Sequence, residues 1–397
     1  MPPESAGAGE PAAGAAEPDG ADDPDPPPWE QATAPKVSSA MSRSRSARSL
    51  MVAGTCRGVP LDWLGRHVRT TGAMVGTAGG AGWSGVVRGG ASRRHRAASG
   101  RWHDGRVTDP YELLDAGDGR RLERFGSRIV DRPSPSAEGR RGNPDAWPAA
   151  DLVFERGTRG QGGRWTHGAD ALPWVVPWGA LQLELRPASG GQVGVFPEHA
   201  RLWPWIHEAV GRAAASRSDG DAGVPGEGDA PEVLSLFAYT GGASLAAAAA
   251  GARVAHVDAA KPAVTWARRN AACSGLAEAP IRWLVDDARA FVAREVRRGR
   301  HYDGFIVDPP SYGHGPSGDA WRLELDLVPL LTDLATLAGD HPSFVLLTAH
   351  TPGLTPDVLA ERLGDAFGVD AEAQALELRA ATGRRLELGS MARWVRP

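Results

Sequence analysis

Three acidic segments in the C-terminal half of the chain follow short apolar runs, where strands of a sheet would end. They are Asp258, the pair Asp286 and Asp287, and residues 308–310, which read Asp-Pro-Pro. In an open parallel α/β sheet, ligands bind beyond the carboxyl ends of the strands. There Asp258 is placed to accept hydrogen bonds from a ribose diol, and Asp287 could accept from an adenine amino group. The pattern predicts a site for an adenosine-containing ligand.

A glycine pair narrows the type of ligand. The loop expected after the first strand, residues 238–242, ends in Gly241 and Gly242. Glycines let a ligand approach the backbone, and the helix that follows offers free N–H groups. A dinucleotide fingerprint would need Gly-x-Gly-x-x-Gly, and the third glycine is missing. An adenosine with a carboxylate tail fits better, which is S-adenosylmethionine. The predicted cofactor residues are Phe237, Ala238, Tyr239, Thr240, Gly241, Gly242, Asp258, Asp286, Asp287 and Asp308.

An alternation of strands and helices must position these residues. The expected strands are 233–237, 253–257, 281–285, 302–307 and 344–348. The expected helices are 244–250, 262–273, 288–298 and 323–337. Short connections between them predict an α/β fold with a mostly parallel sheet and helices on both faces. Two last runs, 375–378 and 385–388, predict a terminal hairpin.

A smaller β-rich region precedes this sheet. Residues 111–115 and 121–125 read as two strands about a glycine turn. The strand pattern continues over 151–154, 174–178 and 181–185. We therefore expect residues 108–215 to form a small β-rich region with a segment that covers the cofactor. A polar linker over 216–230 then leads to a catalytic domain at 231–397.

The first 107 residues have a different composition. Residues 1–40 contain eight acidic residues and one lysine, whereas residues 41–107 contain twelve arginines against two aspartates. With few large apolar side chains, residues 1–40 cannot offset the entropy cost of ordering, and residues 41–107 show no sustained apolar period. We expect 1–107 to be a disordered, low-complexity extension. An arginine-rich arm that binds nucleic acid is the alternative.

Composition also limits the class of protein. No window approaches the roughly 18 consecutive apolar residues that a membrane helix needs, which argues against an integral membrane protein. Two cysteines, Cys56 and Cys273, cannot build a disulfide framework or a tetrahedral zinc site. We predict no metal site and a reducing, cytoplasmic setting. The sequence does not indicate an oligomeric state.

Residues 231–350 resemble the catalytic domain of class I S-adenosylmethionine-dependent methyltransferases. The most similar branch contains the large-subunit ribosomal RNA cytosine-5 and guanine methyltransferases. Residues 236–242 resemble its cofactor loop, and the three acidic segments match its next three motifs. Residues 195–199 with Trp203 resemble the segment that covers the cofactor pocket. The resemblance spans about 111–391. It implies a Rossmann-like sheet, S-adenosylmethionine as cofactor, methyl transfer as the activity, and RNA, in particular ribosomal RNA, as substrate.

The chain departs from that branch in its candidate nucleophile. Cytosine-5 methylation needs a cysteine thiolate, which the family places after the fifth strand, where this chain has residues 348–351, Thr-Ala-His-Thr. Cys273 lies on an earlier helix and is expected to be a buried structural residue. We therefore predict transfer to a nitrogen without a covalent intermediate. His350 and His314 could assist proton removal. The predicted catalytic residues are Asp308, Pro309, Pro310 and Tyr312.

Each predicted catalytic residue has a role. Asp308 could accept a hydrogen bond from the acceptor nitrogen, Pro309 could offer its carbonyl, and Tyr312 could stack on a flipped base. Two alternatives stay open. The acidic balance of the body argues mildly against tight binding of an RNA duplex, which leaves a small-molecule or protein methyltransferase. A non-catalytic adenosine-binding module is the other alternative.

Overall fold

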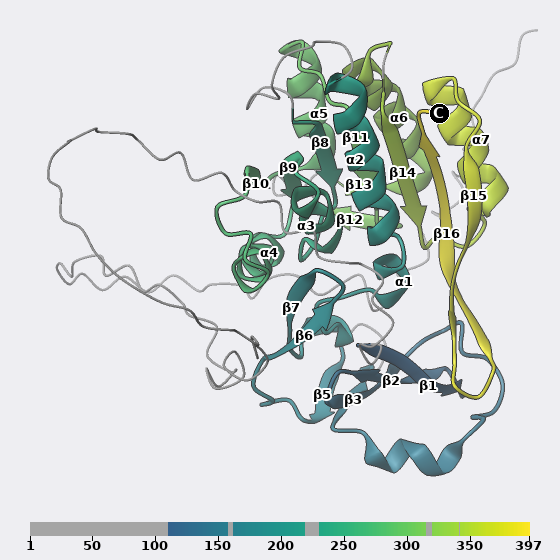
Figure 1. Cartoon of the computed structure of the whole chain (residues 1–397). Helices are drawn as coiled ribbons and strands as arrows, with labels where there is room; N and C mark the ends of the chain where they lie inside the picture. Colours follow the sequence, from purple (N-terminus) through teal and green to yellow (C-terminus); the bar gives the residue numbers. More distant parts are fainter. Residues whose placement is uncertain (1–109, 158–161, 219–229, 315–319, 341) are drawn as a thin grey trace, which may run out of the picture.

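The computed structural model describes residues 110–157, 162–218, 230–314, 320–340 and 342–397 (Figure 1). The extension predicted over 1–107 and most of the linker predicted over 216–230 lie outside the described residues. The described chain forms an N-terminal β-rich part and a C-terminal α/β part, one below the other in Figure 1. None of the described helices is both long and apolar enough to cross a membrane.

A seven-stranded sheet forms the centre of the C-terminal part. Its strands are β8 (Glu232–Leu236), β9 (Arg253–Asp258), β10 (Ile281–Val285), β11 (Gly304–Val307), β14 (Phe344–Ala349), β15 (Glu372–Arg379) and β16 (Arg385–Val395). The strand order is β10-β9-β8-β11-β14-β16-β15. The first five strands in that order run parallel, and β16 runs antiparallel to both of its neighbours. The mostly parallel sheet predicted from the sequence is confirmed.

Helices cover both faces of this sheet, as predicted. They are α1 (Pro197–Ala200), α2 (Trp203–Ser218), α3 (Gly242–Ala249), α4 (Lys261–Cys273), α5 (Ala288–Arg297), α6 (Leu323–Ala338) and α7 (Pro356–Phe367). Successive strand residues point to opposite faces. Ile306 therefore packs in a core with α2 and α3, whereas Phe305 packs with α5, α6 and α7 on the other face.

The N-terminal part consists mainly of antiparallel strands. Its five-stranded sheet contains β1 (Tyr111–Gly117), β2 (Arg120–Phe125), β3 (Arg128–Pro133), β4 (Leu152–Glu155) and β5 (Arg164–His167), in that order. A separate hairpin is formed by β6 (Trp174–Trp178) and β7 (Leu181–Leu185). Buried side chains of this part, among them Phe125 and Leu183, belong to the same hydrophobic cluster as Ile206 and Ala247. The two parts therefore share one core.

The terminal hairpin is longer than predicted and joins the two parts. Its strands β15 and β16 complete the main sheet, and its far end reaches the N-terminal sheet (Figure 1, yellow). There the Ala381 N–H donates to the Leu113 carbonyl at 2.8 Å. The Arg384 guanidinium donates to the carbonyls of Glu138 and Arg140 at 2.7 and 2.8 Å. This hairpin helps to fix the N-terminal part against the edge of the sheet that carries the predicted site.

Candidate active site

The loop between β8 and α3 has a strained backbone. Phe237 and Tyr239 have φ values of 54° and 48°, which side chains other than glycine rarely adopt. Hydrogen bonds fix the loop in this conformation. The Tyr239 N–H donates to Asp258 Oδ2 at 2.7 Å, and the Ala238 N–H donates to the Val257 carbonyl at 3.1 Å. Strain that the surroundings maintain in this way is typical of ligand-binding segments.

Two polar side chains hold the same loop from opposite sides. The Thr240 hydroxyl donates to the Gly194 carbonyl at 2.7 Å, which ties the loop to the segment before α1. Asn270, which is fully buried on α4, donates to the Thr240 carbonyl at 2.9 Å. The Asn270 side-chain oxygen accepts from the Glu184 N–H of β7 at 2.9 Å. One amide thus connects α4, the loop and the β6–β7 hairpin.

The glycines of the loop have a packing role that the sequence did not reveal. A Cβ on Gly242 would lie 2.2 Å from Cζ2 of Trp203, and Gly241 has a φ of +91°. A Cβ on Gly194 would likewise lie 2.3 Å from Trp266. The sequence suggested that Gly241 and Gly242 leave room for a ligand. At Gly242, the structure shows that the room is taken by an indole ring of this chain.

A cavity of about 610 Å³, partly open to solvent, lies against this loop. Residues 237–242 form one wall, and Asp308 and Thr348 lie at the ends of the neighbouring strands. Phe196, His199 and Trp203, from the segment expected to cover the cofactor, form another wall. The Nε1 atom of Trp203 is buried and has no hydrogen-bond partner among the described residues. The cavity therefore offers apolar walls, backbone groups and a carboxylate.

The predicted acids occupy different positions around this cavity. Asp308 lines it, whereas Asp258, Asp286 and Asp287 do not. Asp258 supports the loop through Tyr239, and its Oδ1 accepts from the Ala260 N–H at 2.8 Å. Asp286 is paired with Arg294. Asp287 caps the N-terminus of α5 and accepts from the Ala290 N–H at 2.9 Å. Burial raises the pKa of Asp258, and its two backbone donors oppose that effect.

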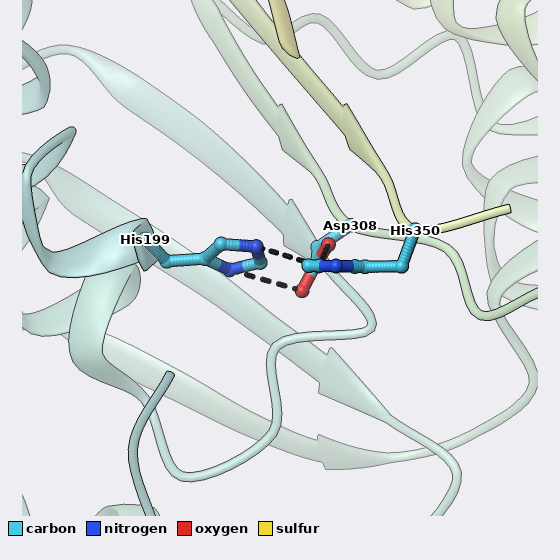
Figure 2. A group of neighbouring side chains, drawn as sticks. All are labelled: His199, Asp308 and His350. Carbon is cyan, nitrogen blue, oxygen red and sulfur yellow. Dashed lines mark hydrogen bonds and ion pairs between the residues drawn. The ribbon is translucent and has the colours of Figure 1, made fainter. Parts of the chain in front are cut away.

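Asp308 belongs to a cluster with two histidines from distant parts of the chain (Figure 2). His199 Nδ1 lies 3.3 Å from Asp308 Oδ2, and the Nε2 atoms of His199 and His350 lie 2.8 Å apart. His350 Nε2 is 3.8 Å from Asp308 Oδ1. The Thr348 hydroxyl donates to Asp308 Oδ1 at 2.5 Å. His199 comes from α1, Asp308 follows β11, and His350 follows β14.

The directions of the hydrogen bonds in the cluster follow from the Leu388 carbonyl, which can only accept a hydrogen bond. His350 Nδ1 lies 2.5 Å from the Leu388 carbonyl, so Nδ1 carries the hydrogen. In the neutral ring, Nε2 of His350 is then an acceptor, and His199 must donate to it through Nε2. Burial lowers the pKa of His199, the charge of Asp308 opposes that effect, and His350 adds to it. When both rings are neutral, His199 Nδ1 therefore presents a lone pair to Asp308.

The same three side chains also have the composition of a metal centre. One ligand atom from each lies within 4.8 Å of the others. However, the two imidazole planes differ by only 27°, and their ring centroids are 4.9 Å apart while the Nε2 atoms are 2.8 Å apart. The rings thus meet tip to tip. In a tetrahedral zinc site each nitrogen lies about 2.0–2.1 Å from the ion, so two nitrogen ligands stand roughly 3.3 Å apart, farther than the 2.8 Å found here. The observed spacing fits a shared proton.

A larger cleft adjoins the cofactor cavity, with Phe196 lining both. The cleft encloses about 1940 Å³ including open solvent, and His350 and Tyr312 lie on its wall. Tyr312 belongs to β12 (Tyr312–His314), which pairs with β13 (Ala320–Arg322). Since His199 and Asp308 line the cavity and His350 lines the cleft, the cluster stands between the two spaces.

Charged side chains of the N-terminal part line the same cleft. They are Arg121, Arg132 and Arg156, and Glu198 of α1 joins them. Arg132 is held at 2.5 Å by the fully buried Glu123. Glu198 is only 4% exposed, and its Oε2 has no hydrogen-bond partner among the described residues. The buried Nη1 of Arg121 has none either. Arg121 also pairs with Glu123, at 3.2 Å, so one carboxylate faces both buried arginines, whereas Arg156 is exposed.

The remaining predicted residues lie in or beside the loop after β11. The Pro310 carbonyl accepts from Trp321 Nε1 at 2.6 Å, and Pro309 is buried. Neither proline lines the cavity or the cleft. The His314 side chain lies outside the described part of the chain. Cys273, expected to be buried, is partly exposed at the end of α4.

An open parallel sheet whose strand ends surround one cavity defines an α/β protein that binds its ligand at the carboxyl edge. A family model described as S-adenosylmethionine-dependent methyltransferase matches residues 221–369. The crystal structure of a SAM-dependent methyltransferase from Agrobacterium tumefaciens is 35% identical, with a TM-score of 0.64 over 73% of this chain and 91% of that one. The chain belongs to the S-adenosylmethionine-dependent methyltransferases.

Curated relatives match over shorter stretches. The "Ribosomal RNA large subunit methyltransferase K/L" of Shewanella frigidimarina is 32% identical over 28% of this chain and 16% of its own length. The "Ribosomal RNA large subunit methyltransferase I" of Photobacterium profundum is 31% identical over 35% of this chain and 34% of its own length. This chain therefore matches about a sixth to a third of these proteins. A putative methyltransferase crystallised with SAH shares the fold, with a TM-score of 0.52 at 15% identity over 72% of this chain and 76% of that one.

Two groups of site residues were not predicted. His199 was noted only as part of the covering segment, and its partner His350 lies 151 residues away. The arginines of the cleft, Arg121 and Arg132, lie on alternating strands where charged residues usually face solvent. No local pattern marks them, because adjacent strand residues face opposite sides and Arg121 and Leu122 are nonetheless both buried.

Proposed function

We propose that this chain transfers a methyl group from S-adenosylmethionine to a nitrogen of an RNA base, with ribosomal RNA as the substrate class. One observation carries this proposal: the cofactor cavity and an arginine-lined cleft meet at Asp308 and His350. The names of the curated relatives support RNA as the substrate. Ribosomal RNA as a substrate would place the activity in the cytoplasm.

The cavity and the strand ends beside it fit S-adenosylmethionine. The first turn of α3, at Gly242, would bind the carboxylate of the cofactor through free N–H groups. Each oxygen of Asp258 accepts one backbone hydrogen bond and keeps a lone pair for a ribose hydroxyl. Asp286 and Asp287 would contribute from the next strand end, near the adenine. When bound, the cofactor supplies an electrophilic methyl group.

A nitrogen acceptor fits the residues after β14. At the position where the cytosine-5 branch has its cysteine, this chain places Thr348 and His350, and both contact Asp308. Neither a hydroxyl nor an imidazole in these contacts replaces the thiolate that carbon methylation requires. The Asp308 carboxylate instead can accept a hydrogen bond from an N–H group and orient its lone pair.

The cleft supplies the features that an RNA strand requires. Phosphates are bound mainly by arginine and lysine, and Arg121, Arg132 and Arg156 line the cleft. Tyr312 can stack on a base that leaves its helix, which is how enzymes reach a base for chemistry. The unpartnered Oε2 of Glu198 can accept from a base amino or imino group. These groups lie beside the cluster that faces the cofactor cavity.

The experiment is a methyl-transfer assay with cofactor labelled in the methyl group. The substrates are ribosomal RNA from a strain that lacks this protein, total protein, and a small-molecule extract. We expect label in the RNA and, after digestion, an N-methylated nucleoside by mass spectrometry. Label only in protein or in small molecules would contradict the proposal. Binding of S-adenosylhomocysteine without any transfer would indicate an adenosine-binding module.

Two variants test the roles of the site and of the cleft. Asp308→Ala should lower turnover about a hundredfold or more with little change in cofactor affinity, because the interaction strengthens in the transition state. Arg156→Ala should weaken RNA binding and reduce the slope of log affinity against log salt by about 1. Arg297→Ala, on an exposed part of α5, is the control and should leave both unchanged.

A further inference from the structure

We propose that His199 and His350 form a proton relay that takes the acceptor's proton from Asp308 and releases it into the cleft. This inference rests on the proposed transfer to a nitrogen, which must lose one proton for each methyl group gained. Methylation itself assigns no route for that proton. The histidine pair stands where such a route is needed, between the cofactor cavity and the solvent-filled cleft.

Counting hydrogens in the cluster identifies one vacant position. With His350 Nδ1 donating to Leu388 and His199 Nε2 donating to His350, two of the three contacts contain a hydrogen. The third contact, between His199 Nδ1 and Asp308 Oδ2 at 3.3 Å, joins two lone pairs when both rings are neutral and Asp308 is ionised. One added proton, placed between His199 Nδ1 and Asp308 Oδ2, gives each of these three contacts a hydrogen. The cluster is therefore built to accept one proton.

Methyl transfer and proton transfer can be followed atom by atom through the cluster. The bond from the acceptor nitrogen to the methyl carbon forms as the carbon–sulfur bond breaks, and that electron pair leaves with sulfur. The acceptor nitrogen then loses its proton to the Asp308 carboxylate, which passes it to His199 Nδ1. His199 Nε2 gives its own hydrogen to His350 Nε2. His350, now an imidazolium, releases its Nε2 hydrogen to water in the cleft, and His199 regains its starting tautomer by proton exchange with water before the next turnover.

The exposure of the two imidazole rings matches this direction. His199 is 14% exposed and Asp308 is 25% exposed, whereas His350 is 33% exposed and lines the cleft. Leu388, which fixes the His350 tautomer, lies on β16 next to β14. A charge on a buried ring is costly because water does not solvate it. The proton is therefore released from His350, the more exposed of the two rings.

The charged groups around His199 set its working range. Asp308 and His350 face it from the ends of β11 and β14, and Glu198 is its neighbour on α1. Burial is the largest of these influences and lowers the pKa of His199 below the usual 6.5. A relay must start neutral, so turnover should be independent of pH near 7 and fall only at a pH below the ordinary histidine value of about 6.5.

The test combines a pH profile with rescue by a small base. His199→Gln and His350→Ala should each lower kcat about a hundredfold, the usual effect of a lost general base. Affinity for S-adenosylhomocysteine should change less than about twofold. Imidazole added to His350→Ala should restore at least severalfold activity through the cleft. His207→Gln removes another partly buried helical histidine with a lowered pKa and should retain the parent profile.

Two results would overturn the relay. The first is a His199→Gln enzyme that keeps the parent kcat and acid limb, or a His350→Ala enzyme that imidazole does not rescue. The second is a parent enzyme that loses activity in a chelator and regains it with zinc, since that would make the cluster a metal centre. Nitrogen-15 NMR of the histidines adds a readout independent of activity. We expect hydrogen on Nδ1 of His350 and Nε2 of His199 at neutral pH. If no RNA is methylated, the proposed function fails, while the NMR tautomers still test the cluster.

Discussion

Replacing Gly242 with alanine should disturb both the stability and the cofactor loop of this chain. The added Cβ would lie 2.2 Å from Cζ2 of Trp203, far inside van der Waals contact. Trp203 is almost fully buried and packs edge-on against Trp178, with ring centroids 5.8 Å apart. The indole can therefore yield mainly toward the cofactor cavity that it lines.

The expected magnitude follows from this overlap. Overpacking of a filled core costs about 1–3 kcal/mol. Taking about 2 kcal/mol, the melting temperature should fall by roughly 2–4 °C for a protein of this size. An indole pushed into the cavity should also weaken S-adenosylhomocysteine binding by about tenfold, which corresponds to about 1.4 kcal/mol. Thermal melts with and without ligand, together with calorimetric titration, measure both effects.

The matched control is Gly211→Ala. Gly211 lies in α2, the helix that begins with Trp203. A Cβ on Gly211 meets nothing within 4 Å, and alanine is favoured over glycine in a helix by roughly 0.5–1 kcal/mol. Gly211→Ala should therefore raise the melting temperature slightly and leave ligand binding unchanged. If Gly242→Ala melts and binds like the parent, the packing argument for this glycine is refuted.

Three further predictions concern single groups. Asp258→Ala should weaken S-adenosylhomocysteine binding by roughly 1.5–3 kcal/mol in calorimetry, the range for a hydrogen bond to a charged group; an unchanged affinity would remove Asp258 from the site. Burial lowers the pKa of His256 to about 3, so between that pH and about 6.5 the unfolded chain holds one more proton. The free energy of unfolding should therefore fall as the pH drops through this window, by at most roughly 4–5 kcal/mol, and less so in His256→Gln. Replacing both Cys56 and Cys273 with alanine should preserve methyl transfer; a dead double variant, with a parent that forms an adduct on fluorinated cytosine RNA, would instead indicate a cysteine nucleophile.

Local patterns predicted most of the main sheet correctly. The strand expected over 233–237 is β8, and the helix expected over 323–337 is α6, because each is a long or strongly apolar run. α7 was not predicted, although Thr355 caps it and Pro356 opens it, both of which are helix-start signals. The terminal hairpin was predicted, but its insertion beside β14 was not. Strand order depends on contacts between distant segments, and no local pattern encodes it.

In the candidate site, too, the features that depend on local sequence were predicted and those that depend on distant contacts were not. The order of the parallel strands predicted that Asp258, Asp287 and Asp308 would follow strand ends at one edge of the sheet. Which of them face the cavity was not predictable. Asp287 caps α5 and Asp286 pairs with Arg294, and such uses depend on side-chain packing. Only the placement of Asp308 on the cavity wall follows directly from the strand that carries it.

The histidine cluster shows why the chemistry is harder to predict than the fold. Asp308 and His350 follow β11 and β14, which are neighbours in the sheet, so their proximity is a consequence of topology. His199 depends on a different cause, the packing of the short helix α1 over the cofactor loop. That packing uses Thr240 bonded to the Gly194 carbonyl and Gly242 seated under Trp203. The residues that hold the loop in place therefore also bring His199 to Asp308, and a disturbance of the loop should be felt in proton transfer as well as in cofactor binding.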